Sequence, residues 1–360
     1  MQIVDADGHI SEGSWAEEIG KHMPKGNRSR GSFFPTLDHL HGGFLRPEGG
    51  RAAGPKIGPD EWVQFLDDTG IDWTVIYPTS GLAMGRITSE DYAVTVCHAY
   101  NDWLHERFTG GNPRIRGMAL IPVQDVPAAV EELHRAVTEL GMCGAMLPSN
   151  GEGLKAHLGS KIYWPIYEEA EKLGCSLAVH GGSHHHLGLD TFSIYYPVNA
   201  LGHPFGIMVQ AAGMISHGVF ERFPKLRVGY LEGGSTWVPF MMDRLDRAYH
   251  EGHAQVDMDG AIAYAPNSGE KPSDYFKRLV HDGRLFVGFD VDDDGLANSV
   301  DRAGGEAFLY ASDFPHEVRT AQMCRGEIDE LLEREDLSEA AKEAVLGKNA
   351  VRFYGDGPSA

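Results

Sequence analysis

The chain has few cysteines, and their scarcity and spacing exclude a disulfide-stapled protein and a thiolate zinc site. Four cysteines occur among the 360 residues, with no paired spacing: Cys97, Cys143, Cys175 and Cys324. We therefore expect free, buried thiols and a location in the reducing cytoplasm. The N-terminus also lacks a basic segment followed by an apolar stretch, so we expect no signal peptide.

Basic residues and long apolar runs are scarce as well. The chain holds 31 Lys and Arg against 52 Asp and Glu, which gives a net charge of −21. Such an acidic protein is not expected to bind nucleic acid or anionic membranes, although a local metal or arginine can still attract an anionic substrate. Because no apolar run reaches about 20 residues, we expect no transmembrane helix.

Two widespread catalytic signatures are missing. The sequence has no Gly-x-Ser-x-Gly elbow and no cysteine at the end of a predicted strand, which argues against serine and cysteine nucleophiles. It also has no Gly-x4-Gly-Lys phosphate loop. Histidine, in contrast, is abundant at 18 residues. Metal chemistry is therefore the first hypothesis to test.

Eight short, nearly continuous apolar runs alternate with segments of helical period. The runs cover residues 3–5, 73–77, 115–121, 143–147, 176–180, 226–232, 284–290 and 307–313. Continuous apolar runs are typical of parallel strands that are buried on both faces. Helical periodicity predicts helices over residues 88–107, 126–140, 164–173 and 327–332.

Eight such units predict an α/β fold, a (β/α)8 TIM barrel that forms one domain over residues 1–360. A doubly wound sheet is the alternative; the strand count and the polar residues at the strand ends favour the barrel. Long segments after the first and fifth strands, residues 11–60 and 181–203, are expected on the catalytic face, the first as a lid. Residues 250–275 form a third insertion that we expect to be mobile.

The C-terminal ends of four predicted strands carry metal-ligand side chains. The first strand ends in Asp7 and His9, which are two residues apart and so point to the same face of an extended chain. His180, Glu232 and Asp313 end the fifth, sixth and eighth strands. In a barrel these ends converge, and two imidazoles with three carboxylates need a cation to balance their charge. The strand ends therefore predict a metal site.

Five segments make the chain similar to the amidohydrolase-related TIM-barrel family of metalloenzymes. They are residues 5–9, 179–182, 218–228, 231–237 and 311–316, and they span almost the whole chain. The family includes metal-dependent decarboxylases and hydrolases. The resemblance implies a barrel with metal ligands from strands one, five and eight, which correspond to Asp7, His9, His180 and Asp313.

Three departures from the family pattern are visible. The start is Asp-x-His, where His-x-His or Glu-x-His is commoner. Glu232 stands where the decarboxylases carry a histidine that helps catalysis. Residues 145–150, at the end of the fourth strand, contain no lysine, so a bridging carboxylated lysine is not expected.

Further polar residues extend the candidate site. His184 belongs to a histidine triplet after the fifth strand, where it is either a solvated loop residue or a proton shuttle. His203 precedes Pro204, which predicts a helix start on the catalytic face. Other candidates for a second shell or a second metal are Glu12, His217 and His316.

The carboxylate-rich set favours iron and oxygen chemistry. Six donors are expected to bind metal: Asp7, His9, His180, His203, Glu232 and Asp313. Hard oxygen ligands stabilise the higher oxidation states of iron. The chain is also similar to the TIM-barrel non-haem diiron monooxygenases of diterpenoid biosynthesis. That likeness implies two Fe ions, O₂ as co-substrate and the hydroxylation of a small, largely apolar molecule. The predicted substrate wall consists of Phe192, Tyr195, Tyr196 and Phe205.

Two other functions remain open. A mononuclear Zn or Mn hydrolase or decarboxylase would use a metal-bound water or a chelated substrate carboxylate. Asp313 would then be the general base, and His184 or His316 would move protons. The third hypothesis is a metal-binding relative with a dead site. In the enzymatic readings the catalytic residues are Glu232, Asp313 and His184, the substrate is a small molecule, and the family likeness favours a homodimer.

Overall fold

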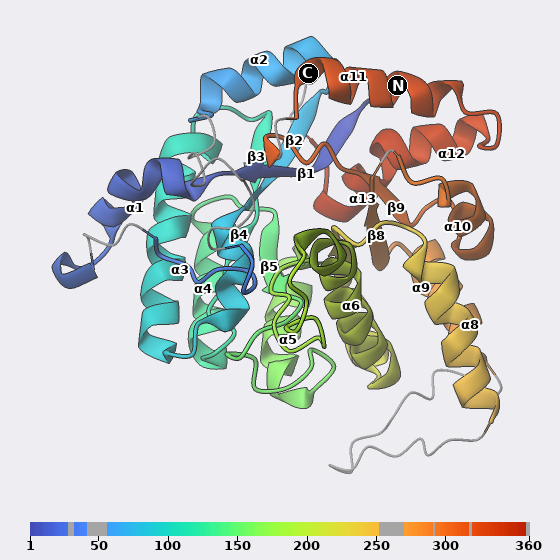
Figure 1. Ribbon diagram of the computed structural model, residues 1–360, viewed down its shortest axis with the longest axis horizontal. Coiled ribbons are helices and arrows are strands. Elements are labelled where there is room, and N and C mark those ends of the chain that lie inside the picture. Colours follow the sequence, from blue (N-terminus) through green and yellow to red (C-terminus); the bar gives the residue numbers. More distant parts are fainter. Residues whose placement is uncertain (28–31, 42–55, 252–269, 291, 317–318, 358–360) are drawn as a thin grey trace.

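The computed structural model describes residues 1–27, 32–41, 56–251, 270–290, 292–316 and 319–357 (Figure 1). Most of the predicted mobile insertion, and residues 28–31 and 42–55 of the predicted lid, lie outside these ranges.

Parallel strands form the centre of the molecule. They are β1 (Val4–Ile10), β2 (Trp73–Pro78), β3 (Ile115–Gly117), β4 (Ala119–Leu120), β5 (Gly144–Pro148), β6 (Ser176–His180), β7 (Arg227–Leu231), β8 (Leu285–Phe289) and β9 (Phe308–Tyr310). They pair in the orders β1-β2-β3 and β4-β5-β6-β7-β8-β9, and every pairing is parallel. Parallel strands require crossover connections, which the helices provide.

Backbone hydrogen bonds connect the two sheets at both sides. Met118, between β3 and β4, donates to Ile76 of β2, and Cys143 donates to Gly117 of β3. On the other side, the amide of Asp313 donates to the carbonyl of Asp7, and the amide of His9 donates to Phe314. Since β3 and β4 are one strand interrupted at Met118, these bonds complete a ring of eight strand positions. The predicted barrel with eight units is confirmed.

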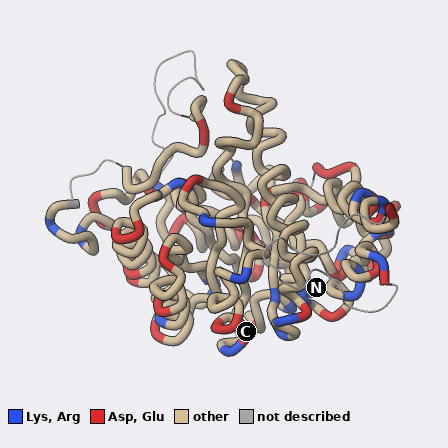
Figure 2. Tube along the Cα trace, turned by 90° about the horizontal axis from the view of Figure 1, so that it is seen from below, with Lys and Arg blue, Asp and Glu red and all other residues tan. Residues whose placement is uncertain are grey.

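Helices surround the strands (Figure 1). They are α1 (Ala16–His22), α2 (Pro59–Thr69), α3 (Glu90–Leu104), α4 (Val126–Thr138), α5 (Trp164–Leu173), α6 (Tyr195–Ser216), α7 (Val219–Arg222), α8 (Trp237–His250), α9 (Pro272–His281), α10 (Leu296–Ala303), α11 (Ala321–Glu333), α12 (Glu339–Glu343) and α13 (Asn349–Tyr354). Along the wall, α3 packs against α4 and α4 against α5. Charged residues lie mainly on this outer layer, and the central strands are mostly uncharged (Figure 2).

Local sequence signals explain several helix boundaries. Asp125 caps α4 by accepting a hydrogen bond from the Ala128 amide, and Pro127 occupies the first turn, where no amide is needed. α5 ends at Gly174, which adopts a left-handed conformation with φ 65°.

One predicted boundary is wrong. Pro204 was expected to start a helix, but it lies inside α6, which begins nine residues earlier at Tyr195. Pro204 removes one backbone hydrogen bond and its ring crowds the carbonyl four residues earlier, but the buried apolar residues on both sides of it keep the segment helical. His203 therefore sits on a helix and not in a loop before one.

No helix within the described residues is both long and apolar enough to cross a membrane.

A buried polar cluster fastens α3 and α4 to the sheet. Asn101 donates to the carbonyl of Leu120 in β4 and accepts from its amide, at 2.8 and 2.9 Å. Asn101 also donates to Glu132, whose carboxylate receives further bonds from Arg135 and His98. Although burial alone would raise the pKa of Glu132, these donors lower it below its usual value. An ionised, fully bonded carboxylate therefore stabilises the fold.

Replacing Glu132 by Gln is expected to lower the free energy of unfolding by about 2–3 kcal/mol, because charge-assisted bonds to a buried group are lost. The contribution of a lowered carboxyl pKa is present above the unfolded-state value, 4.5, and disappears as the pH falls. Urea unfolding at pH 7 and at pH 3.5 should therefore show a large difference from the wild type at pH 7 and a much smaller one at pH 3.5. Glu131→Gln, on the same helix, is the control, and an equal effect of both variants would contradict the prediction.

Candidate metal centre at the mouth of the barrel

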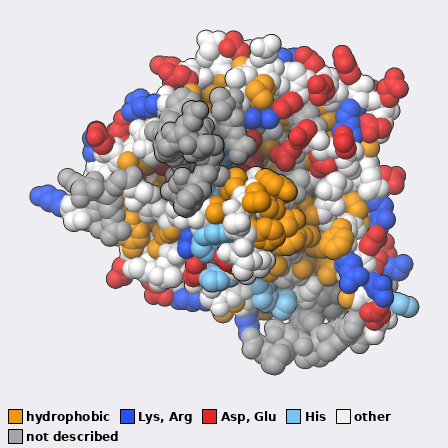
Figure 3. Space-filling model, viewed as in Figure 1, with side chains coloured by type: hydrophobic (Ala, Val, Ile, Leu, Met, Phe, Trp, Pro, Cys, Tyr) orange, Lys and Arg blue, Asp and Glu red, His pale blue; other side chains and the backbone are white. Residues whose placement is uncertain are grey.

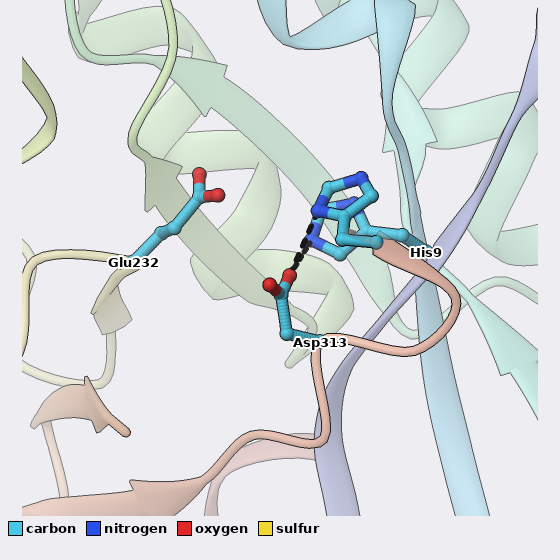
Figure 4. Close-up of side chains that lie close together, drawn as sticks. His9, Glu232 and Asp313 are labelled. Carbon is cyan, nitrogen blue, oxygen red and sulfur yellow. Dashed lines mark ion pairs between the residues drawn. The ribbon is translucent and has the colours of Figure 1, made fainter. Parts of the chain in front are cut away.

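Four ligand-type atoms meet at the C-terminal ends of the strands. Asp7 Oδ1 lies 3.1 Å from His180 Nε2 and 3.4 Å from His9 Nε2. Asp313 Oδ1 lies 3.5 Å from the same nitrogen of His9, and the two side chains face each other in Figure 4. The ends of three separate strands thus bring together the four residues that the sequence predicts as metal ligands.

Hydrogen bonds fix which nitrogen of each imidazole faces the centre. His9 Nδ1 lies 3.1 Å from the carbonyl oxygen of Pro78, and His180 Nδ1 lies 2.9 Å from that of Gly181. Because a carbonyl oxygen only accepts, Nδ1 carries the proton in both rings. Each Nε2 then turns a lone pair toward the carboxylates, which is the arrangement of a metal-binding histidine.

The electrostatics of the centre call for a cation. Burial and the neighbouring His316 hold the pKa of His9 well below its ordinary value. Burial also opposes a proton on His180, but Asp7 and Glu232 outweigh it and raise the pKa of His180 well above its usual value. The carboxylates therefore require positive charge beside them, which a metal ion or a proton on His180 supplies.

The packing of residues 5–9 at the start of the chain holds the ligand-type side chains at the mouth of the barrel. The Asp5 carboxyl is buried and accepts bonds from Thr74 Oγ1 at 2.7 Å and from the amide and hydroxyl of Ser312 at 2.8 and 2.9 Å. It thereby ties β1 to β2 and to the segment after β9. At Gly8 a Cβ atom would lie 2.5 Å from the Trp62 ring, so only glycine fits. Asp7 lies between these two anchors, and His9 directly follows the second.

Backbone strain marks both carboxylates that follow β7 and β9. Glu232 has φ 64° and Asp313 has φ 54°, in the left-handed region that non-glycine residues seldom occupy. Each costs about 1–2 kcal/mol, so the surrounding structure must hold them there. Such strain gathers at functional sites, because it aims a side chain that a relaxed backbone would point elsewhere.

Glu232 approaches the centre from the other side of the mouth (Figure 4). Its Oε2 lies 3.2 Å from His180 Nδ1 and 3.4 Å from His203 Nδ1. Burial raises the pKa of Glu232, with His180 opposing the rise. Glu232 thus contacts the ring edge of His180 that faces away from Asp7.

A chain of hydrogen bonds runs from the predicted lid to His203. Asp38 Oδ2 accepts from His41 Nδ1 at 2.7 Å and from His184 Nδ1 at 2.8 Å. With its Nδ1 donating to Asp38, His184 turns its Nε2 toward His203 Nε2, which lies 3.2 Å away. The other ring nitrogen of His203, Nδ1, faces Glu232. Although burial opposes it, donation by His184 and His41 holds the pKa of Asp38 well below its usual range.

The remaining sequence candidates have other contacts. His316 stacks on His9 with ring centroids 3.9 Å apart and bonds Asp313 at 2.8 Å. Glu12 accepts backbone amides of Thr79, Ser80 and Gly81, which satisfies a buried turn. His217 bonds the Gly213 carbonyl at the end of α6.

The predicted substrate wall divides into two parts. Tyr195 lies beside the mouth, where its hydroxyl is 3.1 Å from His41 Nε2, and Phe205 is half-buried in α6. Tyr196 is 75% exposed and Phe192 is 39% exposed. Figure 3 shows hydrophobic side chains gathered over α6 beside several histidines.

Sequence reasoning missed Asp38, His41 and Asp290. Asp290 follows β8 directly, and the strand-end pattern used for the other residues would have found it. Asp38 and His41 lie in a segment without regular periodicity, and only the spacing Asp-x-x-His hints at their pairing.

A model of the amidohydrolase family matches residues 4–355, nearly the whole chain. This chain belongs to the amidohydrolase family. The predicted family resemblance is thereby confirmed.

Individual family members give more detail. The chain is 26% identical to the 2-amino-3-carboxymuconate-6-semialdehyde decarboxylase of Dictyostelium discoideum, over 84% of this chain and 77% of that protein. Among solved structures, the 5-carboxyvanillate decarboxylase of Sphingomonas paucimobilis superimposes with TM-score 0.73 at 20% identity, over 98% of each chain. A dihydroxybenzoic acid decarboxylase of Polaromonas, solved with bound manganese and 2-nitroresorcinol, gives TM-score 0.68 at 19% identity, over 98% of this chain and 96% of that one.

These relatives overturn the preferred function. The prediction of a non-haem diiron monooxygenase with two Fe and O₂ is wrong, because the relatives are decarboxylases and a structural neighbour holds manganese. The alternative, a mononuclear Zn or Mn hydrolase or decarboxylase, agrees with them better. The number of carboxylate donors had favoured iron. Glu232 lies near His180 and His203, and it also groups with His9, Asp313 and His316 as a cluster that could hold a metal, so its role as a ligand stays a prediction.

Proposed function

We propose that this protein is a decarboxylase of a small unsaturated or aromatic carboxylic acid, and that it uses one divalent metal ion, Mn²⁺ or Zn²⁺. The observation that carries the proposal is the convergence of Asp7, His9 and His180 at the mouth, with Asp313 beside His9. The decarboxylase relatives support the reaction.

The residues present fit such a metal. Among the described side chains, His9 Nε2 is fully buried without a hydrogen-bond partner, although ligand-type oxygens of Asp7 and Asp313 lie close by. A buried nitrogen of this kind is costly unless something binds it. Two imidazoles and two carboxylates without thiolate suit Mn²⁺ and Zn²⁺.

The metal would bind oxygen atoms of the substrate and stabilise the negative charge that develops on them. Loss of CO₂ breaks a carbon–carbon bond and leaves its electron pair on the substrate carbon, which must then take up a proton. Glu232 is the group we assign to deliver it, because burial raises its pKa and favours the protonated form. His203 Nδ1 lies 3.4 Å from Glu232 Oε2, and both atoms are buried without a hydrogen-bond partner among the described residues, so His203 is the imidazole that faces this carboxyl group.

Decarboxylation itself is the first experiment. The Mn²⁺-loaded protein is incubated under argon with a panel of hydroxybenzoates and unsaturated dicarboxylates, and released CO₂ is measured. We expect turnover without oxygen, and loss of turnover after treatment with a chelator. Strict dependence on O₂, or hydrolysis without CO₂ release, would contradict the proposal.

Replacing Glu232 by Gln is expected to lower kcat about 100- to 1,000-fold, because the amide cannot donate a proton to carbon. Metal content should stay unchanged, since the four proposed ligands remain. Elemental analysis and CO₂ release measure the two effects. Loss of the metal from this variant would show that Glu232 is a ligand and not the proton donor.

We also propose a cytoplasmic location, with which the four buried free cysteines agree. The homodimer stays a prediction.

A further inference from the structure

A basic cavity lies at the end of the barrel opposite the proposed metal centre. Its volume is about 640 Å³, and its charged lining residues are Lys225, Arg227, Arg278, Arg284, Arg352, Glu221 and Asp282. Arg227 begins β7, and Glu232 follows the other end of the same strand. At about 3.3 Å per residue, the strand separates the two sites by about 16 Å.

Three of the arginines at this cavity have no carboxylate partner among the described residues. Arg227 donates to the carbonyl of Gly174, Arg352 to that of His281, and Arg284 to those of Phe220 and Phe223. Carbonyl oxygens orient these guanidinium groups but do not neutralise their charge. Arg278, in contrast, is ion-paired with Glu270 and Glu221.

Arg284 is the most unusual of the three. Its side chain is buried, with 8% of the residue exposed, and its Nε has no hydrogen-bond partner among the described residues. Burial lowers the pKa of Arg284 and also that of Arg227, because a buried cation loses the solvation of water. Glu221 and Asp282 nearby favour the charged form of Arg284 but do not outweigh its burial, and a bound anion would offset the remaining cost.

The charge of the cavity also contrasts with the rest of the chain. Five basic and two acidic side chains line it, in a protein whose net charge is −21. Since the overall field repels anions, a cluster of unpaired guanidinium groups is conspicuous here. Guanidinium groups present paired donors that match the oxygens of phosphate and carboxylate groups.

We infer that this cavity binds a small polyanion, a metabolite with at least two phosphate or carboxylate groups, through Arg227, Arg284 and Arg352. The site does not depend on the proposed decarboxylase function, because none of these residues lies at the metal centre. The size of the cavity admits a metabolite, and its position leaves the mouth of the barrel free.

Calorimetric titration of the full-length protein tests the site, with inorganic pyrophosphate as the phosphate probe and tricarballylate as the carboxylate probe. Ionic strength is kept constant with NaCl, so that general screening does not contribute. We expect saturable binding of at least one probe. The probe that binds more tightly identifies the anionic group that the site prefers.

Two variants show whether the measured heat comes from binding in this cavity or from binding elsewhere on the protein. The double variant Arg227→Gln/Arg352→Gln should weaken binding at least about tenfold, since two charge-assisted contacts are lost. Arg222→Gln is the matched control, because Arg222 lies over the Trp164 ring and does not line the cavity. Chelation of the enzyme's metal by a probe would be the same in both proteins. The inference would be overturned if the double variant and the control bound the probes with the same affinity. It would also be overturned if neither probe produced more heat than a titration with sodium chloride.

Discussion

Replacing His180 by Asn is expected to leave less than about one tenth of a metal ion per chain and to lower decarboxylation at least about 1,000-fold. His180 ends β6, and its Nε2 points at Asp7 Oδ1 from 3.1 Å. Asn is too short to place a donor atom there. Because the remaining donors are mostly carboxylates, the variant also loses the positive charge that His180 can carry next to them.

Metal analysis after dialysis and CO₂ release with a saturating substrate measure this effect. His250→Asn is the control, because His250 lies exposed at the end of α8. It should keep the metal content and the activity of the wild type. A His180→Asn protein with a full metal complement and normal turnover would show that His180 is not a ligand. That result would contradict the proposed metal centre.

Replacing Asp38 by Asn should lower kcat by about 100-fold, no more than the loss of the Glu232 proton donor and less than the ~10,000-fold loss seen when a catalytic histidine is deprived of its orienting carboxylate. Asp38 accepts four hydrogen bonds, from His41 and His184 through Oδ2 and from the amides of Leu40 and His41 through Oδ1. Whichever way the Asn amide turns, its NH₂ group faces donors. The orientations of His184 and His203 are then no longer held, and the imidazole that faces Glu232 is displaced.

The readouts for Asp38 distinguish positioning from a structural defect. We expect kcat to fall while KM changes less than about threefold and metal content stays that of the wild type, because Asp38 contacts none of the four proposed ligands. Asp190→Asn is the matched control, since Asp190 is a half-exposed carboxylate that faces His185 in the loop after β6. If the two variants lose equal activity, the chain from Asp38 to His203 has no special role.

The wrong prediction of an oxygenase has a physical cause in the carboxylates of the site. Counting carboxylates along the sequence suggested a diiron site, because Glu232 was added to the donors of the other strands. In the structure Glu232 lies beside the protonated nitrogen of His180 and beside His203. A carboxylate in this position can orient the histidines and move protons, and the metal content of the Glu232→Gln variant decides whether it also binds the metal.

The sequence by itself determined the strands, the barrel and the four converging side chains. Apolar runs reveal buried parallel strands wherever both faces are covered, and the runs at residues 176–180 and 73–77 match β6 and β2 almost residue for residue. The end of a buried strand is also fixed by its sequence, so Asp7, His9, His180 and Asp313 could be placed at the mouth in advance. These inferences need only local periodicity and the direction of parallel strands.

Only the tertiary structure decided what the residues between the strands do. Asp38 belongs to a segment without periodicity, yet it meets His184 from 146 positions away. The start of α6 at Tyr195 moved His203 from a loop onto a helix, where it faces Glu232. The basic cavity likewise joins Arg227 and Arg352, which are far apart in sequence. Such contacts depend on how distant segments pack, because burial, tautomers and charge pairing are set by neighbours in space and not along the chain.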